Sequence, residues 1–332
     1  MKKFLNDAIT FRDEALTGFV RMHKDIVELC ESGRYLIRAH PNRKKVALIS
    51  GGGSGHEPLH IGFVGKGMLD AACPGEIFTS PTPDQVAAAA SAIGGRNGVL
   101  FIVKNYAGDI MNFEMGRELY DGPASMIIID DDIATSNNTR SQGRRGVAGT
   151  VIVEKIVGAA AERGASLAAL KELGQRVAGS TRSLGVALSS CTVPALGRPT
   201  FTLALDEIEM GVGIHGEAGR RRMKLASGRE LADEMMATIT DALARQGRTR
   251  GPAILLVNGF GGTPASELYL MAEMASSAMA RHGYVLARGL VGNYATSLDM
   301  AGCSLTVSVV NDDLLELWDA PVYTAAMRWG CA

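Results

Sequence analysis

Short apolar runs that end in glycine or in polar residues alternate, in the first half of the chain, with longer stretches of helical periodicity. A continuous apolar run bounded by turn residues is typical of a buried strand, and apolar residues three or four positions apart indicate a helix. We expect strands at 46–50, 98–103 and 126–129, and helices at 84–93, 149–163 and 167–177. This alternation predicts an α/β domain with a mostly parallel sheet.

The same alternation starts again after about residue 183. We expect strands at 184–188, 200–205 and 253–257, further strands around Leu286 and Leu305, and helices at 229–245, 264–281 and 312–318. No Pro- or Ser-rich linker separates the two halves, which indicates that they pack together. The predicted fold is α/β, with two packed domains at 1–182 and 183–332 and mostly parallel or mixed sheets flanked by helices.

Composition narrows the class of protein. Of the 332 residues 46% are hydrophobic and 21% are charged, so the chain can bury a full core. A net charge of −1 argues against a nucleic-acid binder, and the apolar runs are far shorter than the roughly 18 residues of a membrane span. We therefore expect a cytoplasmic protein. An odd number of widely spaced cysteines favours free thiols over disulfides or a zinc cluster: Cys30, Cys73, Cys191, Cys303 and Cys331.

The most informative segment is Gly-Gly-Gly-Ser-Gly-His-Glu-Pro at 51–58, directly after the predicted strand 46–50. Loops at the carboxyl ends of parallel strands are the usual ligand location in open α/β sheets. Glycines there let backbone N–H groups approach the oxygens of a ligand. The segment is not a Walker A loop, because no Gly-Lys-Ser/Thr follows. The alternative is a tight turn without a ligand.

A second polar segment, Lys-Asn-Tyr-Ala-Gly-Asp at 104–109, follows the strand 98–103 in the same topological position. It places Lys104 and Asp109 beyond a strand end, where both charges are costly to bury unpaired. Either these side chains belong to a site, or they form a surface ion pair on an exposed turn.

A third segment contains a literal Gly-x-Gly-x-x-Gly at positions 211, 213 and 216. The residues 217–222 break the helix that should bind a pyrophosphate, and no strand ends in an acid about 20 residues further on. A nucleotide-dependent oxidoreductase is therefore disfavoured. His215 remains, and the glycines around it let a substrate approach, although an isolated histidine is more often structural.

We assign no catalytic or ligand-binding role to the other polar clusters. Asp130, Asp131 and Asp132 point in different directions as consecutive residues, so we interpret them as a loop that caps the next helix rather than a cation site. The arginines at 144–145 and 220–222 are interpreted as solvated. Four histidines are interpreted as structural or surface residues: His23, His40, His60 and His282.

Together these segments resemble the dihydroxyacetone kinase family, from about residue 7 to the end of the chain. The resemblance depends on six motifs: 51–58, Cys-Pro-Gly-Glu-Ile-Phe-Thr-Ser-Pro-Thr at 73–82, 104–109, Gly-Arg-Arg-Gly at 143–146, Gly-Val-Gly-Ile-His-Gly-Glu at 211–217 and Thr-Ser-Leu-Asp-Met at 296–300. Within the family the chain is similar to the stand-alone dihydroxyacetone-binding subunit of the phosphotransferase-system-dependent bacterial enzyme.

The resemblance implies roles for individual residues. His215 matches the histidine that binds the carbonyl carbon of the substrate as a covalent hemiaminal, and a neutral imidazole is a competent nucleophile for a ketone. His56 and Asp109 match the general acid or base and hydrogen-bond partner of the terminal hydroxyl. The implied substrate-binding residues are Gly53, Ser54, Gly55, His56, Lys104 and Asp109.

The resemblance also implies partners. No cofactor or metal is expected on this chain, whereas ADP and Mg²⁺ are expected on a kinase partner subunit that a phosphohistidine protein of the phosphotransferase system recharges. A homodimer is expected, and the product is dihydroxyacetone phosphate. The alternatives are a ketose-sensing transcriptional co-activator and an erythrulose-specific subunit. His56 and Asp109 favour the enzyme, whereas Ala107 and Ala218, which replace a common Thr and a common Pro, leave the ketose open.

Overall fold

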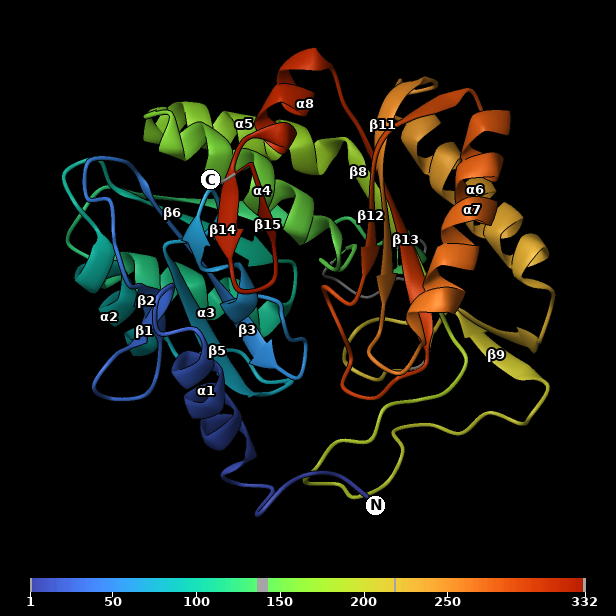
Figure 1. Cartoon of the computed structure of the whole chain (residues 1–332), viewed down its shortest axis with the longest axis horizontal. Helices are drawn as coiled ribbons and strands as arrows, with labels where there is room; N and C mark the ends of the chain where they lie inside the picture. Colours follow the sequence, from blue (N-terminus) through green and yellow to red (C-terminus); the bar gives the residue numbers. More distant parts are fainter. Residues whose placement is uncertain (1, 136–142, 218, 331–332) are drawn as a thin grey trace. The chain divides into compact units, whose positions relative to one another are not determined.

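The structure is a computed structural model that describes residues 2–135, 143–217 and 219–330, and its chain divides into two units (Figure 1). The first unit comprises 1–129, 152–176 and 316–332, and the second comprises 130–151 and 177–315. The single boundary expected near residue 183 is therefore wrong. The segment 130–151 joins the second unit through a bridge between Asp132 and Ser183, and the C-terminal segment returns to the first.

A six-stranded mixed sheet forms the centre of the first unit, in the order β1-β2-β5-β3-β6-β7. Its strands are β1 (Val27–Leu29), β2 (Leu36–Arg38), β3 (Ala47–Ser54), β5 (Ala71–Ile77), β6 (Val99–Lys104) and β7 (Ala124–Ile129). The last four are mutually parallel where they pair, and β1 and β2 pair antiparallel at one edge. The continuous apolar runs of the sequence follow from this burial, because both faces of a parallel sheet are covered.

The two faces of this sheet have different characters. Alternate residues such as Ile49 and Phe101 form an apolar core with α2 (Pro83–Ile93) and α3 (Ala107–Glu118). The opposite face carries Ser50 and Lys104, both buried, toward α4 (Gly149–Glu162). Since side chains alternate across a strand, Leu48 and Ile102 share this second face, so its two polar side chains lie in an otherwise apolar layer.

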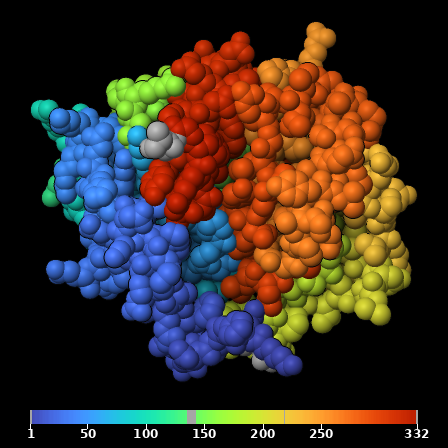
Figure 2. All heavy atoms as spheres, viewed as in Figure 1, coloured from blue at the N-terminus to red at the C-terminus, as the bar shows by residue number. Residues whose placement is uncertain are grey.

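The remaining elements of the first unit lie around this sheet. They are α1 (Phe11–Met22), α5 (Leu167–Gly179), the 3₁₀ helix Ile61–Phe63, and a small sheet of β4 (Gly65–Lys66), β14 (Val322–Thr324) and β15 (Arg328–Trp329). Because β14 pairs with β4, the C-terminal segment belongs to this unit, and Figure 2 shows it in red beside the blue N-terminal surface. Trp318 of α8 (Asp312–Asp319) lies 5.7 Å from Trp329 between ring centroids.

The second unit has its own six-stranded sheet, in the order β10-β9-β8-β13-β11-β12. Its strands are β8 (Thr181–Ala187), β9 (Glu207–Met210), β10 (Arg221–Lys224), β11 (Gly251–Gly259), β12 (Tyr284–Gly292) and β13 (Gly302–Val309). Only β11 and β12 pair in parallel. The adjacent helices α6 (Gly228–Ala244) and α7 (Ala265–Arg281) supply much of the core against this sheet (Figure 1). The α/β class with mixed sheets is confirmed.

Three local expectations differ from the structure. The glycines 51–53 extend β3 instead of forming a turn after it, because they pair with β5. Residues 200–205 form no strand, and Leu205 is fully exposed. The segment after Lys104 is the helix α3 rather than a turn.

The cysteines follow the expectation of free thiols. Cys73, Cys191 and Cys303 are buried free thiols and Cys30 is a half-buried one, whereas Cys331 lies outside the described residues. Within the described ranges, no helix is long and apolar enough to cross a membrane.

Candidate active site

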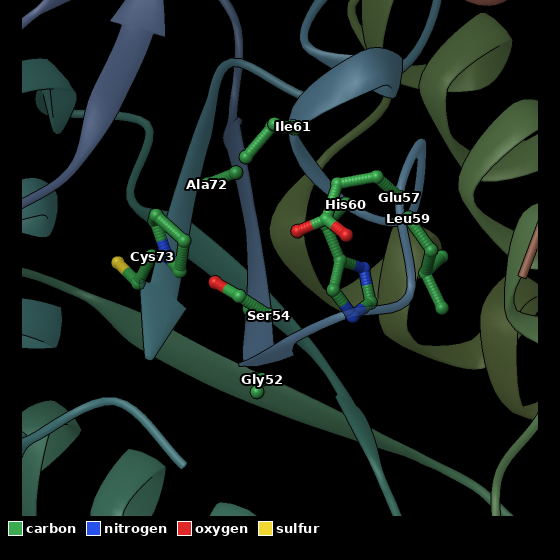
Figure 3. A pocket seen from close by; sticks show the side chains of 11 residues that line it. Gly52, Ser54, Glu57, Leu59, His60, Ile61, Ala72 and Cys73 are labelled. Atoms are coloured by element: carbon green, nitrogen blue, oxygen red, sulfur yellow. The ribbon is translucent and has the colours of Figure 1, made fainter. Parts of the chain in front are cut away.

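The glycines at the end of β3 let two strands and a loop approach one another closely. Gly52 and Gly53 pair with Pro74 and Gly75 of β5. A Cβ atom at Gly53 would lie 2.6 Å from the backbone nitrogen of Thr79, so a larger residue requires the backbone to move. A cavity of about 10 Å³ lies beside this strand end, room for about one water molecule. Figure 3 shows Gly52 and Ser54 on one strand, with Glu57 and His60 on the loop that follows.

His56 is buried in this loop against an aromatic ring. Its imidazole stacks on Phe78, with 5.0 Å between centroids and 18° between planes. Phe78 has a φ of 56°, a left-handed conformation that is rare for a bulky residue, and its N–H donates to the carbonyl of Ser54 at 2.9 Å. Backbone strain at a residue that contacts a candidate catalytic group is typical of functional sites.

Ser54 and Gly55, both predicted substrate-binding residues, make contacts within the protein. The hydroxyl of Ser54 donates to the carbonyl of Gly75 at 2.7 Å, and the N–H of Gly55 donates to the carboxylate of Glu57 at 3.0 Å. Burial raises the pKa of the Glu57 carboxyl. These contacts fix the path of the loop that carries His56.

Lys104 and Asp109 are both buried, so the alternative of an exposed turn with a surface ion pair is wrong. Lys104 is the last residue of β6, and Asp109 lies in the first turn of α3, where the helix dipole favours a carboxylate. Lys104 Nζ lies 3.6 Å from Asp109 Oδ2, and Asp109 also accepts a hydrogen bond from the Ser80 hydroxyl. A Cβ atom at Gly52 would lie 2.3 Å from Nζ, so only glycine leaves room for the ammonium group.

His60 is buried, so of the two roles that the sequence left open, structural or surface, the structure excludes the surface one. Its Nε2 lies 2.8 Å from Lys104 Nζ, and its Nδ1 lies 2.7 Å from Glu154 Oε1. Burial, and then the charges of Lys104 and His56, hold the pKa of His60 well below its usual value. Burial raises the pKa of Glu154 to about 8. The signal in the sequence was a single acid inside the apolar segment 151–157 of a predicted helix.

His215 lies in the second unit and is half-buried, on the largely buried segment 211–217. Its backbone N–H donates to Glu217 Oε2 at 2.9 Å, and Glu217 Oε1 accepts from Arg145 at 2.7 Å. Arg145 also donates to the carbonyl of Gly211 at 2.9 Å and pairs with Asp132 at 2.7 Å. Arg145 therefore fixes the position of the segment that carries His215. Its interpretation as a solvated residue is wrong.

The neighbouring charged clusters follow the sequence more closely. Asp130 pairs with Arg144, whereas Asp131 accepts from the backbone N–H groups of Val147 and Gly149 at 2.8 Å, which caps the start of α4. Burial raises the pKa of Asp131 and brings that of Asp132 to about 6. Residues 220–222 and the histidines at 40 and 282 are exposed, and His23 is half-buried. In the part of the chain that the structure describes, no three His, Cys, Asp or Glu side chains could hold a metal ion.

Comparison with known proteins shows to which family the chain belongs. The Dak1 domain matches residues 17–326. The dihydroxyacetone-binding subunit DhaK of the PEP-dependent dihydroxyacetone kinase of Escherichia coli is 46% identical over 356 residues, covering 99% of this chain and 100% of that relative. The structure of a dihydroxyacetone kinase operon co-activator has a TM-score of 0.89 at 34% identity and covers 95% of this chain and 97% of that one.

A further similar structure is that of the dihydroxyacetone kinase of C. freundii in complex with AMP-PNP and Mg²⁺, with a TM-score of 0.86 at 35% identity. The match covers 98% of this chain and 61% of that protein. The family that the motifs around residues 56, 109 and 215 indicated is thus confirmed over nearly the whole length. The chain belongs to the Dak1 domain family.

Proposed function

We propose that this chain is the dihydroxyacetone-binding subunit of a phosphotransferase-system-dependent dihydroxyacetone kinase. The observation that carries the proposal is the buried group of Lys104 and Asp109 beside the glycine-rich end of β3, next to the loop with His56. Burying charges is costly even when they are paired, and clusters of buried charges are typical of functional sites. The E. coli relative that carries this name matches over its full length.

The first proposed step is covalent capture of the ketose by His215. A neutral ring nitrogen attacks the carbonyl carbon, a C–N bond forms, and the π electron pair moves to the oxygen. The imidazole loses its N–H proton and the oxygen takes up a proton, so the hemiaminal keeps every atom of the substrate. Glycerol has no carbonyl carbon and cannot be captured. Two features support this role: the glycines 213 and 216 beside His215, and the hydrogen bonds by which Arg145 holds the segment that carries it.

The second proposed step is phosphoryl transfer to a terminal hydroxyl of the bound ketose. His56 or Asp109 accepts the hydroxyl proton while the oxygen attacks the terminal phosphoryl group of a nucleotide, and ADP departs. Lys104 and the backbone around Gly53 contact the substrate. We place the nucleotide and Mg²⁺ on a partner kinase subunit, where a phosphohistidine protein recharges ADP. The acting form is a homodimer in the cytoplasm, and the product is dihydroxyacetone phosphate.

A second candidate function is a ketose-dependent co-activator, which the similarity to the operon co-activator favours. Capture of a ketone by a histidine serves either function. A general acid or base is needed only for transfer, and here His56 and Asp109 are both present and buried. An erythrulose-specific subunit is the third candidate function, which the sequence left open because of Ala107 and Ala218. Ala107 is exposed at the start of α3, and Ala218 lies outside the described residues.

Native mass spectrometry and a reconstituted assay test the proposal. The protein is incubated near neutral pH with dihydroxyacetone, erythrulose or glycerol, and we expect an adduct with the full mass of a ketose and none with glycerol. Turnover is then measured with a kinase subunit and a phosphohistidine donor charged from phosphoenolpyruvate. If an adduct forms but no ketose is turned over, the kinase proposal is wrong and the co-activator function is favoured. If kcat/KM is greater for erythrulose than for dihydroxyacetone, the substrate is erythrulose.

A further inference from the structure

Two buried ionisable side chains, His60 and Glu154, lie behind Lys104 and have no role in the steps above. The Glu154 side chain is 0% exposed and that of His60 is 3% exposed. Glu154 Oε2 has no hydrogen-bond partner among the described residues, so the group is held at a cost to stability. A buried polar network that only stabilised the fold would be replaceable by apolar residues.

The contacts of the imidazole assign its protons. An ammonium group has donors only, so Lys104 Nζ at 2.8 Å donates to a lone pair on His60 Nε2. The ring proton is therefore on Nδ1, which faces Glu154 Oε1 at 2.7 Å and the hydroxyl of Ser50 at 2.9 Å. By accepting from Nδ1–H, Oε1 of the Glu154 carboxyl favours the tautomer of His60 that presents an acceptor to Lys104.

The acceptors around Lys104 decide what its third N–H can do. One N–H donates to His60 Nε2 and a second to the carbonyl of Gly51 at 3.1 Å. The remaining neighbour is Asp109 Oδ2 at 3.6 Å, which is longer than a hydrogen bond. Without the acceptor on His60, Nζ keeps the longer hydrogen bond to the Gly51 carbonyl and is free to turn about it toward Asp109. A direct ion pair would then close the gap between ammonium and carboxylate.

We propose that Glu154 and His60 are positioning residues that hold Lys104 away from Asp109, so that a substrate hydroxyl can bind to both. The inference rests on the proposed function, in which that hydroxyl receives the phosphoryl group. The missing Cβ at Gly52 serves the same end, because Nζ occupies the space where that atom would lie. The gap between Lys104 and Asp109 is a property of the protein before any ligand binds.

Two substitutions at one position separate orientation of Lys104 from simple packing. The amide oxygen of a glutamine reaches about the position of Nε2 and that of an asparagine about the position of Nδ1. His60→Gln therefore retains an acceptor for Lys104, and His60→Asn removes it. In the reconstituted assay we expect His60→Asn to lower kcat/KM about 10²-fold, the size of effect that a misplacement of about 1 Å produces. We expect His60→Gln to lose less than about tenfold.

The controls and the second readout make the proposal independent of turnover. Glu162→Gln, two helical turns further along α4 in an ion pair with Arg38, should keep full activity, whereas Glu154→Leu should follow His60→Asn. Crystal structures without ketose should show Nζ within about 2.8 Å of Asp109 in His60→Asn and not in His60→Gln. Equal losses in both variants, or an unchanged gap in His60→Asn, would overturn the proposal. A wild type with no turnover but with the predicted gap changes would refute the proposed function alone.

Discussion

Replacing the buried carboxyl of Glu154 changes how the stability of the first unit depends on pH. In the folded protein burial raises the pKa of this group to about 8, whereas in the unfolded chain it titrates near the ordinary value of 4.5. The folded state therefore holds a proton that the unfolded state has released over this range. Its contribution to stability is complete below pH 4.5 and is lost as pH rises through 8.

The size of the effect follows from the two pKa values. Each tenfold difference in a proton affinity corresponds to about 1.4 kcal/mol, so a shift from 4.5 to about 8 corresponds to at most about 5 kcal/mol. Glu154→Gln keeps an oxygen that can accept a hydrogen bond from His60 Nδ1–H, and the glutamine side chain does not titrate. Its amide nitrogen, at the position of the unpartnered Oε2, costs about 1–3 kcal/mol at every pH. The stability of the variant relative to that of the wild type is therefore lowest at pH 5 and rises with pH.

The chain provides a probe for the first unit alone. Its two tryptophans, Trp318 and Trp329, both lie in that unit, so their fluorescence reports its unfolding in urea. We expect the free energy of unfolding of the variant minus that of the wild type to rise by a few kcal/mol between pH 5 and 8.5. For Glu162→Gln the same difference should stay flat, because the charge of Lys45 and the ion pair with Arg38 keep the pKa of Glu162 below its usual value despite its burial. A difference for Glu154→Gln that is independent of pH would refute the reasoning.

Three further predictions concern the proposed chemistry. His215→Ala should lose the ketose adduct in native mass spectrometry and discriminate poorly between dihydroxyacetone and glycerol; an undiminished adduct would place the nucleophile elsewhere. His56→Ala and Asp109→Ala should each lower turnover about 10²–10⁴-fold while the adduct persists, and near-normal turnover in both would favour the co-activator. Gly213→Ala places a Cβ atom 2.0 Å from Glu217 Oε1 and 2.6 Å from Arg145, so the adduct should weaken at least tenfold. Gly289→Ala, where no atom lies within 4 Å of the added Cβ, is its control in the second unit.

The sequence predicted those parts of the fold that depend on continuous burial. The runs at 98–103 and 126–129 correspond to β6 and β7, because a strand covered on both faces contains apolar residues throughout. The strand β5 was missed, since Pro74 and Gly75 interrupt its apolar pattern and are tolerated only through pairing with the glycines of β3. The C-terminal strand β14 was missed because its partner β4 is far away in the sequence.

The candidate site was predicted where motifs are local, and missed where contacts are distant. Lys104 and Asp109 lie five residues apart, so the sequence alone placed them together. The contact between His60 and Glu154 joins residues 94 positions apart. The apolar segment 151–157 marks Glu154 as unusual, but nothing in the sequence indicates its partner. Only the alternation of side chains along β3 and β6, which turns Ser50 and Lys104 to the face covered by α4, brings the four groups together.

Glycine makes up 40 of the 332 residues, and the contacts of four of them show why glycine is needed there. In the first unit Lys104 Nζ occupies the space of a Cβ at Gly52 and donates to the carbonyl of Gly51. In the second unit Glu217 Oε1 and Arg145 occupy the space of a Cβ at Gly213, and Arg145 donates to the carbonyl of Gly211. A cation that lies against bare backbone gains a carbonyl acceptor, which restrains it. Each unit thus fixes its charged group through the backbone, which is why the glycines lie beside the residues proposed to bind and transform the ketose.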